Sequence, residues 1–281
     1  MAKLAENKYG KSRVRLVRVK RGKNGHELHE WTIQVLLQGD FESCFTEGDN
    51  SKILPTDTMK NTVYSLAKDS SAGCIEDFAK EMIEFLLSRN SQISTAEINV
   101  SEAAWNHLKV GSVVHPTTFV QAGGESQTTS IKKERGAEFF VASGLDNLII
   151  LKTAGSAFEG YMKDSLTTLR ETNDRLFGTA LRANWTYSAP KLPFASLRRK
   201  IRETLLMAFA EHQSKSVQHT LYDMAANVLG SVPEVKDVEL SMPNKHCLLV
   251  DLSRFGQENA NEIFVPTDEP HGYIEARVCR E

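Results

Sequence analysis

Histidines are the side chains of this sequence whose type and spacing could most directly support metal chemistry. His26 and His29 stand three residues apart, and a neutral imidazole nitrogen is a common ligand of zinc. The segment around them is rich in turn residues, and no third ligand follows nearby. We therefore interpret both as surface histidines, and we predict that the chain has no metal site.

A second candidate is Gly10-Lys11-Ser12, which matches the end of a phosphate-binding loop. That loop needs an earlier glycine where this sequence has Ala5, and no strand precedes it, so we reject a nucleotide site. Alternation along a strand would spread the basic residues here over both faces, which favours a solvated edge strand over a nucleic-acid surface. These residues are Lys11, Arg13, Arg15, Arg18, Lys20, Arg21 and Lys23.

Three further polar segments have ordinary structural interpretations. Pro55-Thr56-Asp57-Thr58 is typical of a helix start in which Asp57 or Thr58 caps free amides. Ser216-Val217-Gln218 is typical of a helix start capped by the serine. The adjacent Asp174 and Arg175 would usually be surface charges. Spacing alone leaves the function of these segments open.

Composition excludes several classes of protein. The chain has 281 residues, of which 41% are hydrophobic, and a net charge of -2 gives no overall attraction to nucleic acid or to anionic membranes. No stretch approaches the roughly 20 apolar residues of a membrane helix, and the N-terminus has no apolar signal core. The four scattered cysteines indicate free thiols. We expect a soluble protein of the reducing cytoplasm.

The first half of the chain predicts two strands, two helices and two strands. Residues 13–20 and 31–38 read as a hairpin around Gly22-Lys23-Asn24-Gly25. Met59, Val63 and Leu66 have helical spacing, and a stronger amphipathic helix begins at Ile75. Two further strands are expected around residues 98–100 and 117–121.

The second half repeats this order. Residues 137–142 and 148–153 are predicted strands, and helical spacing begins at Phe194 and again at Val217, ending at a Gly230 cap. Strands are expected at 238–242, 247–252 and 274–278. The fold class is therefore α+β, a duplication of the order ββααββ with mostly antiparallel sheets, divided into domains 1–137 and 138–281. Helices would cover one face of each sheet. The other face would need a partner, so we predict that copies of the chain associate.

Together, short segments along nearly the whole chain resemble the urate oxidase family in order and separation. They are Tyr9-Gly10-Lys11-Ser12, Thr56-Asp57, Lys60-Asn61-Thr62-Val63-Tyr64, Ser156-Ala157-Phe158, Thr167-Thr168-Leu169, Asp174-Arg175, Ser216-Val217-Gln218 and Pro243-Asn244-Lys245-His246. The resemblance implies tandem tunnelling-fold (T-fold) domains that assemble as a homotetramer, a barrel around a central tunnel. It also implies active sites between subunits.

The resemblance further implies a site for urate, a flat and electron-rich purine anion. Arg175 and Gln218 would bind its polar edges, Phe158 would stack on its face, and backbone amides near Asp57 and Val217 would bind the remaining edge. Asn244, with Thr56, would hold oxygen or water above the ring. The implied proton relay is Lys11, Thr56 and His246, in which Thr56 passes a proton between a neutral Lys11 and the bound water or peroxide.

The implied reaction is the oxidation of urate by O2, with no metal and no organic cofactor, to 5-hydroxyisourate and hydrogen peroxide. The partners would be urate, O2 and other copies of the chain, with no nucleic acid and no membrane. The sequence ends Cys279-Arg280-Glu281 without a peroxisomal Ser-Lys-Leu type signal, which favours the cytoplasm. The alternatives are another T-fold enzyme acting on a pterin or purine, some of which use zinc, and a non-catalytic purine-binding tetramer.

Overall fold

The computed structural model describes residues 2–280, and its internal contacts divide the chain into two compact units. The first unit comprises Met1–Gly144 and Tyr187–Ala195, and the second comprises Leu145–Thr186 and Ser196–Glu281. The predicted domains 1–137 and 138–281 stay a prediction, and their end residues 1 and 281 lie outside the described residues. Within residues 2–280 no helix is both long and apolar enough to cross a membrane.

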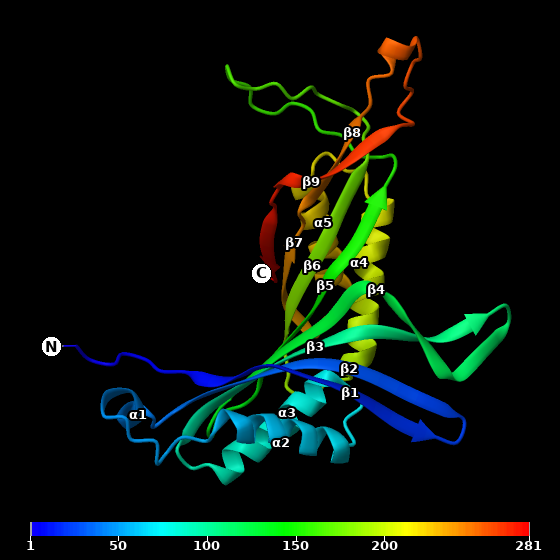
Figure 1. Ribbon diagram of the computed structural model, residues 1–281. Coiled ribbons are helices and arrows are strands. Elements are labelled where there is room, and N and C mark those ends of the chain that lie inside the picture. Colours follow the sequence, from blue (N-terminus) through cyan, green and yellow to red (C-terminus); the bar gives the residue numbers. More distant parts are fainter. Residues whose placement is uncertain (1, 281) are drawn as a thin grey trace. The chain divides into compact units, whose positions relative to one another are not determined.

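The first unit is an antiparallel sheet with helices on one face (Figure 1). Its strands pair in the order β1, β2, β3, β4, and helices α2 and α3 pack against β1, β3 and β4. The bounds are β1 Tyr9–Gly22, β2 Gly25–Gly39, α1 Glu42–Thr46, α2 Thr56–Asp69, α3 Ile75–Arg89, β3 Ile93–Val110 and β4 Val113–Glu134.

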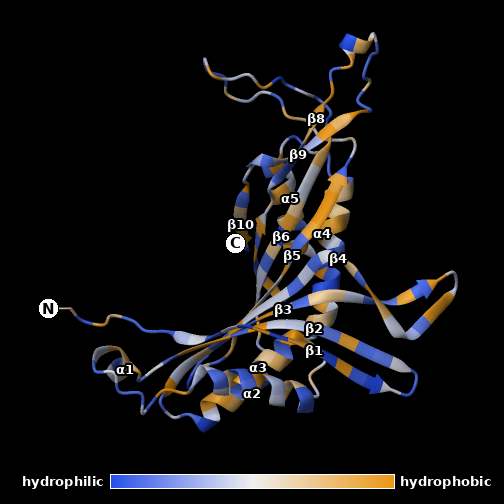
Figure 2. Ribbon diagram, viewed as in Figure 1, coloured by the Kyte–Doolittle hydropathy of each residue, from blue (hydrophilic) through white to orange (hydrophobic). Residues whose placement is uncertain are grey.

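Alternation along β2 and helical spacing along α3 build the core of this unit. Ile33, Val35 and Leu37 are fully buried on the helix side of the sheet, and Phe78 and Met82 of α3 are fully buried against it. Burial of each such side chain contributes roughly 1.5–3 kcal/mol relative to exposure. Hydrophobic and hydrophilic stretches alternate along α2 and α3 in Figure 2, as expected for helices that cover one face of a sheet.

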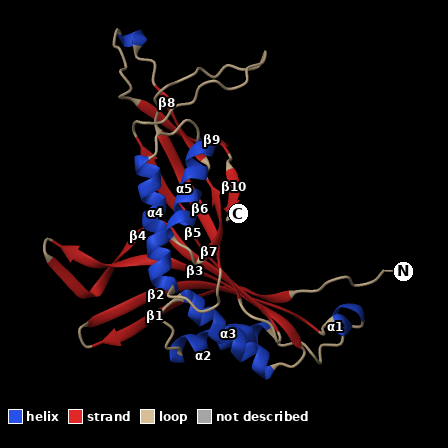
Figure 3. Cartoon of the chain, turned by 180° about the vertical axis from the view of Figure 1, so that it is seen from behind, coloured by secondary structure: helices blue, strands red, loops and turns tan. Residues whose placement is uncertain are grey.

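The second unit repeats the plan with an added hairpin (Figure 3). Strand order runs β5, β6, β7, β10, while β8 pairs with β6 and with β9. Helix α5 packs on β7 and β10. The bounds are β5 Phe140–Lys152, which begins in the first unit, β6 Phe177–Tyr187, α4 Phe194–Glu211, α5 Val217–Ser231, β7 Val235–Ser241, β8 Asn244–Leu249, a 3-10 turn Ser253–Phe255, β9 Phe264–Gly272 and β10 Glu275–Cys279.

Two arginines mark the duplication at atomic detail. Arg135 donates hydrogen bonds to the carbonyl oxygens of Leu87, Asn90 and Ile93, at the end of α3 and just beyond it. In the second unit Arg280 donates to the carbonyl oxygens of Leu229, Val232 and Val235, which have the same spacing at the end of α5 and beyond it. The backbone N–H of each arginine also donates to the carbonyl of the residue that follows its last acceptor. Each guanidinium thus satisfies helix carbonyls that lack an intrahelical partner.

The predicted α+β class and the repeated order are confirmed, with local corrections: α1 and β9 are additional elements, and the predicted strand 247–252 is β8 at Asn244–Leu249. The strands predicted at 137–142 and 148–153 form one strand, β5, which runs through the turn-like sequence Ser143-Gly144-Leu145-Asp146-Asn147 with Asn147 at φ 58°. Strand β6 was not predicted, because Arg182 and Asn184 interrupt its apolar pattern. Gly230 lies inside α5 and is not a left-handed cap, since Val232 ends that helix through its N–H bond to the carbonyl of Val228.

Candidate functional site

Lys11 stands at a β-bulge in β1. Lys11 pairs with Val35 and Val14 pairs with Ile33, so a step of three residues on β1 opposes a step of two on β2, with Arg13 at φ 57°. Paired residues share a face of a sheet, and Val35 faces the helices. The extra residue therefore turns Lys11 to the same face as Val14, toward α2, which regular alternation would not allow.

Tyr9 fixes this strand to the segment that precedes α2, and Gly10 lets the strand lie close against β2. The Tyr9 hydroxyl accepts from the backbone N–H of Leu54 at 2.9 Å and donates to the carbonyl of the same residue at 3.1 Å. Burial raises the pKa of Tyr9. A Cβ on Gly10 would lie 1.8 Å from the Val35 carbonyl oxygen, so the strands can approach this closely only at a glycine. Tyr9 was not among the predicted site residues, although it lies in the family-like segment Tyr9-Gly10-Lys11-Ser12.

Helix α2 begins at Thr56, directly after Pro55, and presents its first backbone amides without a side-chain cap among the described residues. The prediction that Asp57 or Thr58 caps this helix is therefore wrong. The Asp57 carboxylate instead binds Lys60 and the amide of Asn61, and hydrogen bonding to Lys60 lowers the pKa of Asp57, with a smaller contribution from the charge of Lys11. Lys11 thus lies within electrostatic range of the start of α2.

Phe158 and Arg175 meet in the second unit. The guanidinium carbon of Arg175 lies 5.1 Å from the centre of the Phe158 ring, and a backbone bridge between Phe158 and Thr172 holds the two segments together. Burial lowers the pKa of Arg175, and its Nε is buried without a hydrogen-bond partner among the residues described. Asp174 is exposed, as the surface-charge interpretation predicts, and accepts from the N–H of Ser156 at 3.2 Å, whereas the guanidinium of Arg175 is half-buried.

The start of α5 lies beside the same loop. Ser216 caps the helix by accepting from the N–H of His219 at 3.1 Å, as the sequence predicted. Val217 and Gln218 occupy the first two helical positions, where backbone amides have no acceptor within the helix. Val217 is buried and Gln218 is exposed. The N–H of Ala157 donates to the carbonyl of Ser214 at 2.8 Å, which brings the loop carrying Phe158 against the segment that leads into α5.

Asn244 and His246 lie on β8 with their side-chain nitrogens 3.3 Å apart. Asn244 is 8% exposed and pairs with Thr179 of β6, while His246 pairs with Thr267 of β9. Residues two apart on a strand point to one face, so the amide and the imidazole face the same side.

The predicted site residues therefore form two sets. Lys11, Thr56 and Asp57 gather in the first unit, at the bulge of β1 and the start of α2. The second unit holds the rest on the Phe158 loop, on the first turn of α5 beside it, and on β8. Among residues 2–280 no three or more His, Cys, Asp or Glu side chains gather as a metal-binding group.

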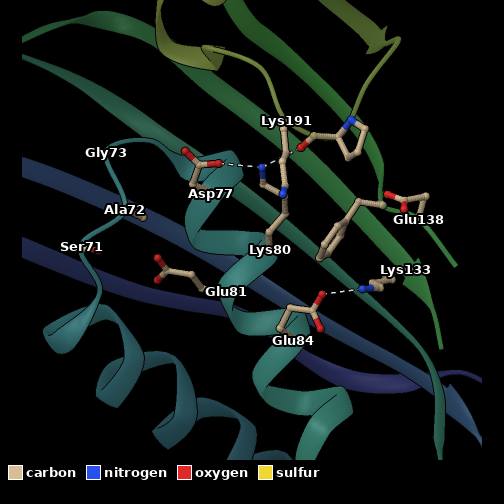
Figure 4. Close-up of a pocket in the computed structure, with 12 residues that line it drawn as sticks. Ser71, Ala72, Gly73, Asp77, Lys80, Glu81, Glu84, Lys133, Glu138 and Lys191 are labelled. Atoms are coloured by element: carbon tan, nitrogen blue, oxygen red, sulfur yellow. Dashed lines mark hydrogen bonds and ion pairs between the residues drawn. The ribbon is translucent and has the colours of Figure 1, made fainter. Parts of the chain in front are cut away.

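A separate pocket of about 780 Å³ beside α3 contains none of these residues (Figure 4). Two of its three lysines point toward acidic partners: Lys80 lies 2.8 Å from Asp77 and donates to the Pro190 carbonyl at 2.9 Å, and Lys133 lies 2.5 Å from Glu84. Because these charges are balanced within the first unit, we assign them to its structure.

The repeated antiparallel sheets, each with helices on one face, define a chain of tandem T-fold units. A model of the uricase family matches residues 7–132 and 141–275. The uricase of Dictyostelium discoideum is 37% identical over 282 residues, covering 100% of this chain and 98% of that protein. The uricase of Arthrobacter globiformis is 37% identical over 278 residues, covering 99% and 90%. A crystal structure of uricase from Arthrobacter globiformis aligns with a TM-score of 0.94 at 36% identity, covering 100% of this chain and 96% of that one. The chain belongs to the uricase family.

Proposed function

We propose that this chain oxidises urate with O2 and water to 5-hydroxyisourate and hydrogen peroxide, without a metal or an organic cofactor. The proposal rests on the family membership over the full chain and on the side chains at the two sets of site residues. The balance closes: urate loses two electrons and two protons, O2 takes them up as hydrogen peroxide, and water supplies the hydroxyl group of the product.

The observation that carries this proposal is the half-buried Arg175 beside Phe158, with an Nε that the described residues leave unpaired. A guanidinium presents parallel donors that suit a carbonyl oxygen and an adjacent ring nitrogen, and an aromatic ring suits the face of a purine. Urate offers both features. We assign Gln218 and the N–H of Val217 to a further edge of the same molecule, because both lie on the first turn of α5.

We assign proton transfer to Lys11, Thr56 and His246. Thr56 offers a hydroxyl that both donates and accepts, and it stands at the start of α2, on the side of the sheet to which the bulge turns Lys11. Asn244 shares a face of β8 with His246, which supports a joint role in holding O2 or water. Positioning and proton management are then the protein's contribution to the rate.

We propose that each complete site forms between subunits of a homotetramer, in which open sheets combine into a barrel around a tunnel. Thr56 and Asp57 of one chain would then face Phe158, Arg175, Val217 and Gln218 of another, and the N–H of Asp57 would bind urate. Exposed apolar side chains on the strands support such an assembly, among them Phe140, Ile149 and Leu151 of β5. We also propose a cytoplasmic location and keep domains 1–137 and 138–281 as the duplicated units.

The test follows urate absorbance, oxygen consumption and peroxide release together, using purified protein dialysed against a strong chelator and assayed for bound metal and flavin. Matched loss of urate and oxygen by protein free of both would support the proposal. Persistence of urate, or activity that needs added zinc or flavin, would contradict it and make pterins the next substrates to test.

A further inference from the structure

Two histidines and an aspartate form a chain of contacts where α4 meets α5. His212 Nε2 lies 3.1 Å from His219 Nδ1, and His212 Nδ1 lies 3.3 Å from the Asp223 carboxylate. The side chain of His212 is 11% exposed. The carboxylate favours a proton on Nδ1 of His212, which leaves its Nε2 to accept from His219. None of these residues belongs to the site described above.

The connection between the two helices, residues 212–216, is held by hydrogen bonds at His212 and Ser214. Lys152 of β5 donates to the His212 carbonyl at 2.6 Å and to the Phe209 carbonyl at 3.3 Å. Ser214 exchanges backbone hydrogen bonds with Gly155 and Ala157. This connection therefore joins the loop that carries Phe158 to the turn that carries Val217 and Gln218.

His219 is the point at which the histidine pair reaches this turn. Its backbone N–H binds the cap Ser216, and its imidazole binds His212. The contact between the rings thus ties the first turn of α5 to the end of α4, while Asp223, one turn further along α5, fixes the other side of the His212 ring. A rotation of the turn would break the contact between the two rings.

We propose that Asp223, His212 and His219 form a positioning network that holds the first turn of α5 in the orientation required for binding urate. The inference rests on the proposed function, because it assigns Val217 and Gln218 to the substrate. None of the three side chains is a catalytic residue here, since they act through the backbone and side chains of that turn.

The network predicts a dependence on pH with a definite sign. A proton on Nε2 of His212 takes away the acceptor for the N–H of His219 and so breaks the 3.1 Å hydrogen bond between the rings. Burial lowers the pKa of His212, with smaller lowering by the charges of His219 and Lys152 and opposition from Asp223. Glu203 and Glu211 of α4 line a pocket of about 600 Å³ together with His212 and Asp223. The network is therefore intact while His212 is neutral, and it is lost as pH falls through the lowered pKa of His212.

The decisive comparison is His219→Ala against His219→Asn. Asparagine places an amide near the position of Nδ1 and can still meet His212, whereas alanine cannot, and both keep the backbone N–H that Ser216 caps. We expect His219→Ala to raise the KM for urate by about ten-fold with a smaller effect on kcat, and His219→Asn to restore most of the affinity. The acid limb of kcat/KM against pH should move in His219→Ala and return in His219→Asn.

Amide hydrogen exchange of residues 213–220 gives a readout that does not depend on turnover. Faster exchange in His219→Ala than in wild type and His219→Asn supports the network. Unchanged exchange, or an unchanged KM and pH profile in a folded and active His219→Ala protein, overturns it. Wild-type protein that leaves urate untouched overturns the proposed function instead, so the two failures are distinguishable.

Discussion

Arg175 lies over the ring of Phe158, with its guanidinium carbon 5.1 Å from the ring centre, and the two residues come from segments joined by a backbone bridge. A cation this close to an aromatic face is attracted to it, which holds the guanidinium beside Phe158. The site therefore presents donors next to the ring before any ligand arrives.

Arg175→Lys tests whether the guanidinium donors of Arg175 bind urate. Lysine keeps the charge but loses the planar pair of donors, so we expect kcat/KM for urate to fall at least about 100-fold, equivalent to about 2.7 kcal/mol. Steady-state kinetics measures the change. Arg182→Lys is the matched control, since the side chain of Arg182 is 64% exposed and 3.8 Å from Asp146. Equal activity of both variants would remove Arg175 from the substrate site.

Lys11→Met tests the relay. Methionine fills a similar volume without a proton to exchange, so we expect kcat to fall about 100-fold or more while urate still binds. Anaerobic titration with urate separates binding from turnover. Lys8→Met serves as the control because Lys8 forms an exposed ion pair with Glu97. Normal turnover by Lys11→Met would eliminate the proposed proton path.

Arg135→Ala and Arg280→Ala test the equivalence of the two helix ends. Each removes a cation that binds three carbonyl groups, and we expect each to lower the free energy of unfolding by about 1–3 kcal/mol. Urea denaturation measures the effect. Arg15→Ala removes one exposed ion pair with Glu30 and should change stability by less than about 1 kcal/mol. Losses no larger than that of Arg15→Ala would refute the assigned role.

Cys74 should resist alkylation at pH 8. Burial raises the pKa of Cys74 to about 12, so almost none of the reactive thiolate is present, whereas Cys279 is exposed. Iodoacetamide followed by peptide mass analysis should label Cys279 first and Cys74 only after unfolding. Because the folded pKa is raised, the stabilising contribution of Cys74 is complete below the unfolded pKa of 9.0 and is lost as pH rises toward 12. Rapid labelling of Cys74 in folded protein would contradict its burial.

Elements with strong apolar periodicity could be predicted from sequence. Alternation along β2 and the i, i+3, i+4 pattern of α3 each identify a buried face without knowledge of the partner, and both are confirmed. Strand β6 could not be found in this way. It is buried over most of its length, so both of its faces are lined by neighbouring elements and its residues need not alternate.

Some features of the site could likewise be predicted from the sequence, and others could not. Ser216 caps α5 as predicted, because capping depends on residues within one turn of each other. The Asp57 cap failed because Lys60 and Asn61, one helical turn further on, compete for the same carboxylate. The orientation of Lys11 depends on a bulge, which arises only when β1 pairs with β2. The contact between Arg175 and Phe158 joins residues 17 positions apart in the sequence. Roles for these residues came from family resemblance.

The bulge at Arg13 makes the site sensitive to the count of residues as well as to their kinds. Every second residue of a regular strand shares a face, so regular pairing of the same residues without the bulge would place Lys11 on the face opposite Val14. A separation of three residues with the bulge and a separation of two without it therefore present the lysine to the same face. The face that Lys11 takes is therefore set by the length of the segment that follows it together with the pairing of that segment with β2.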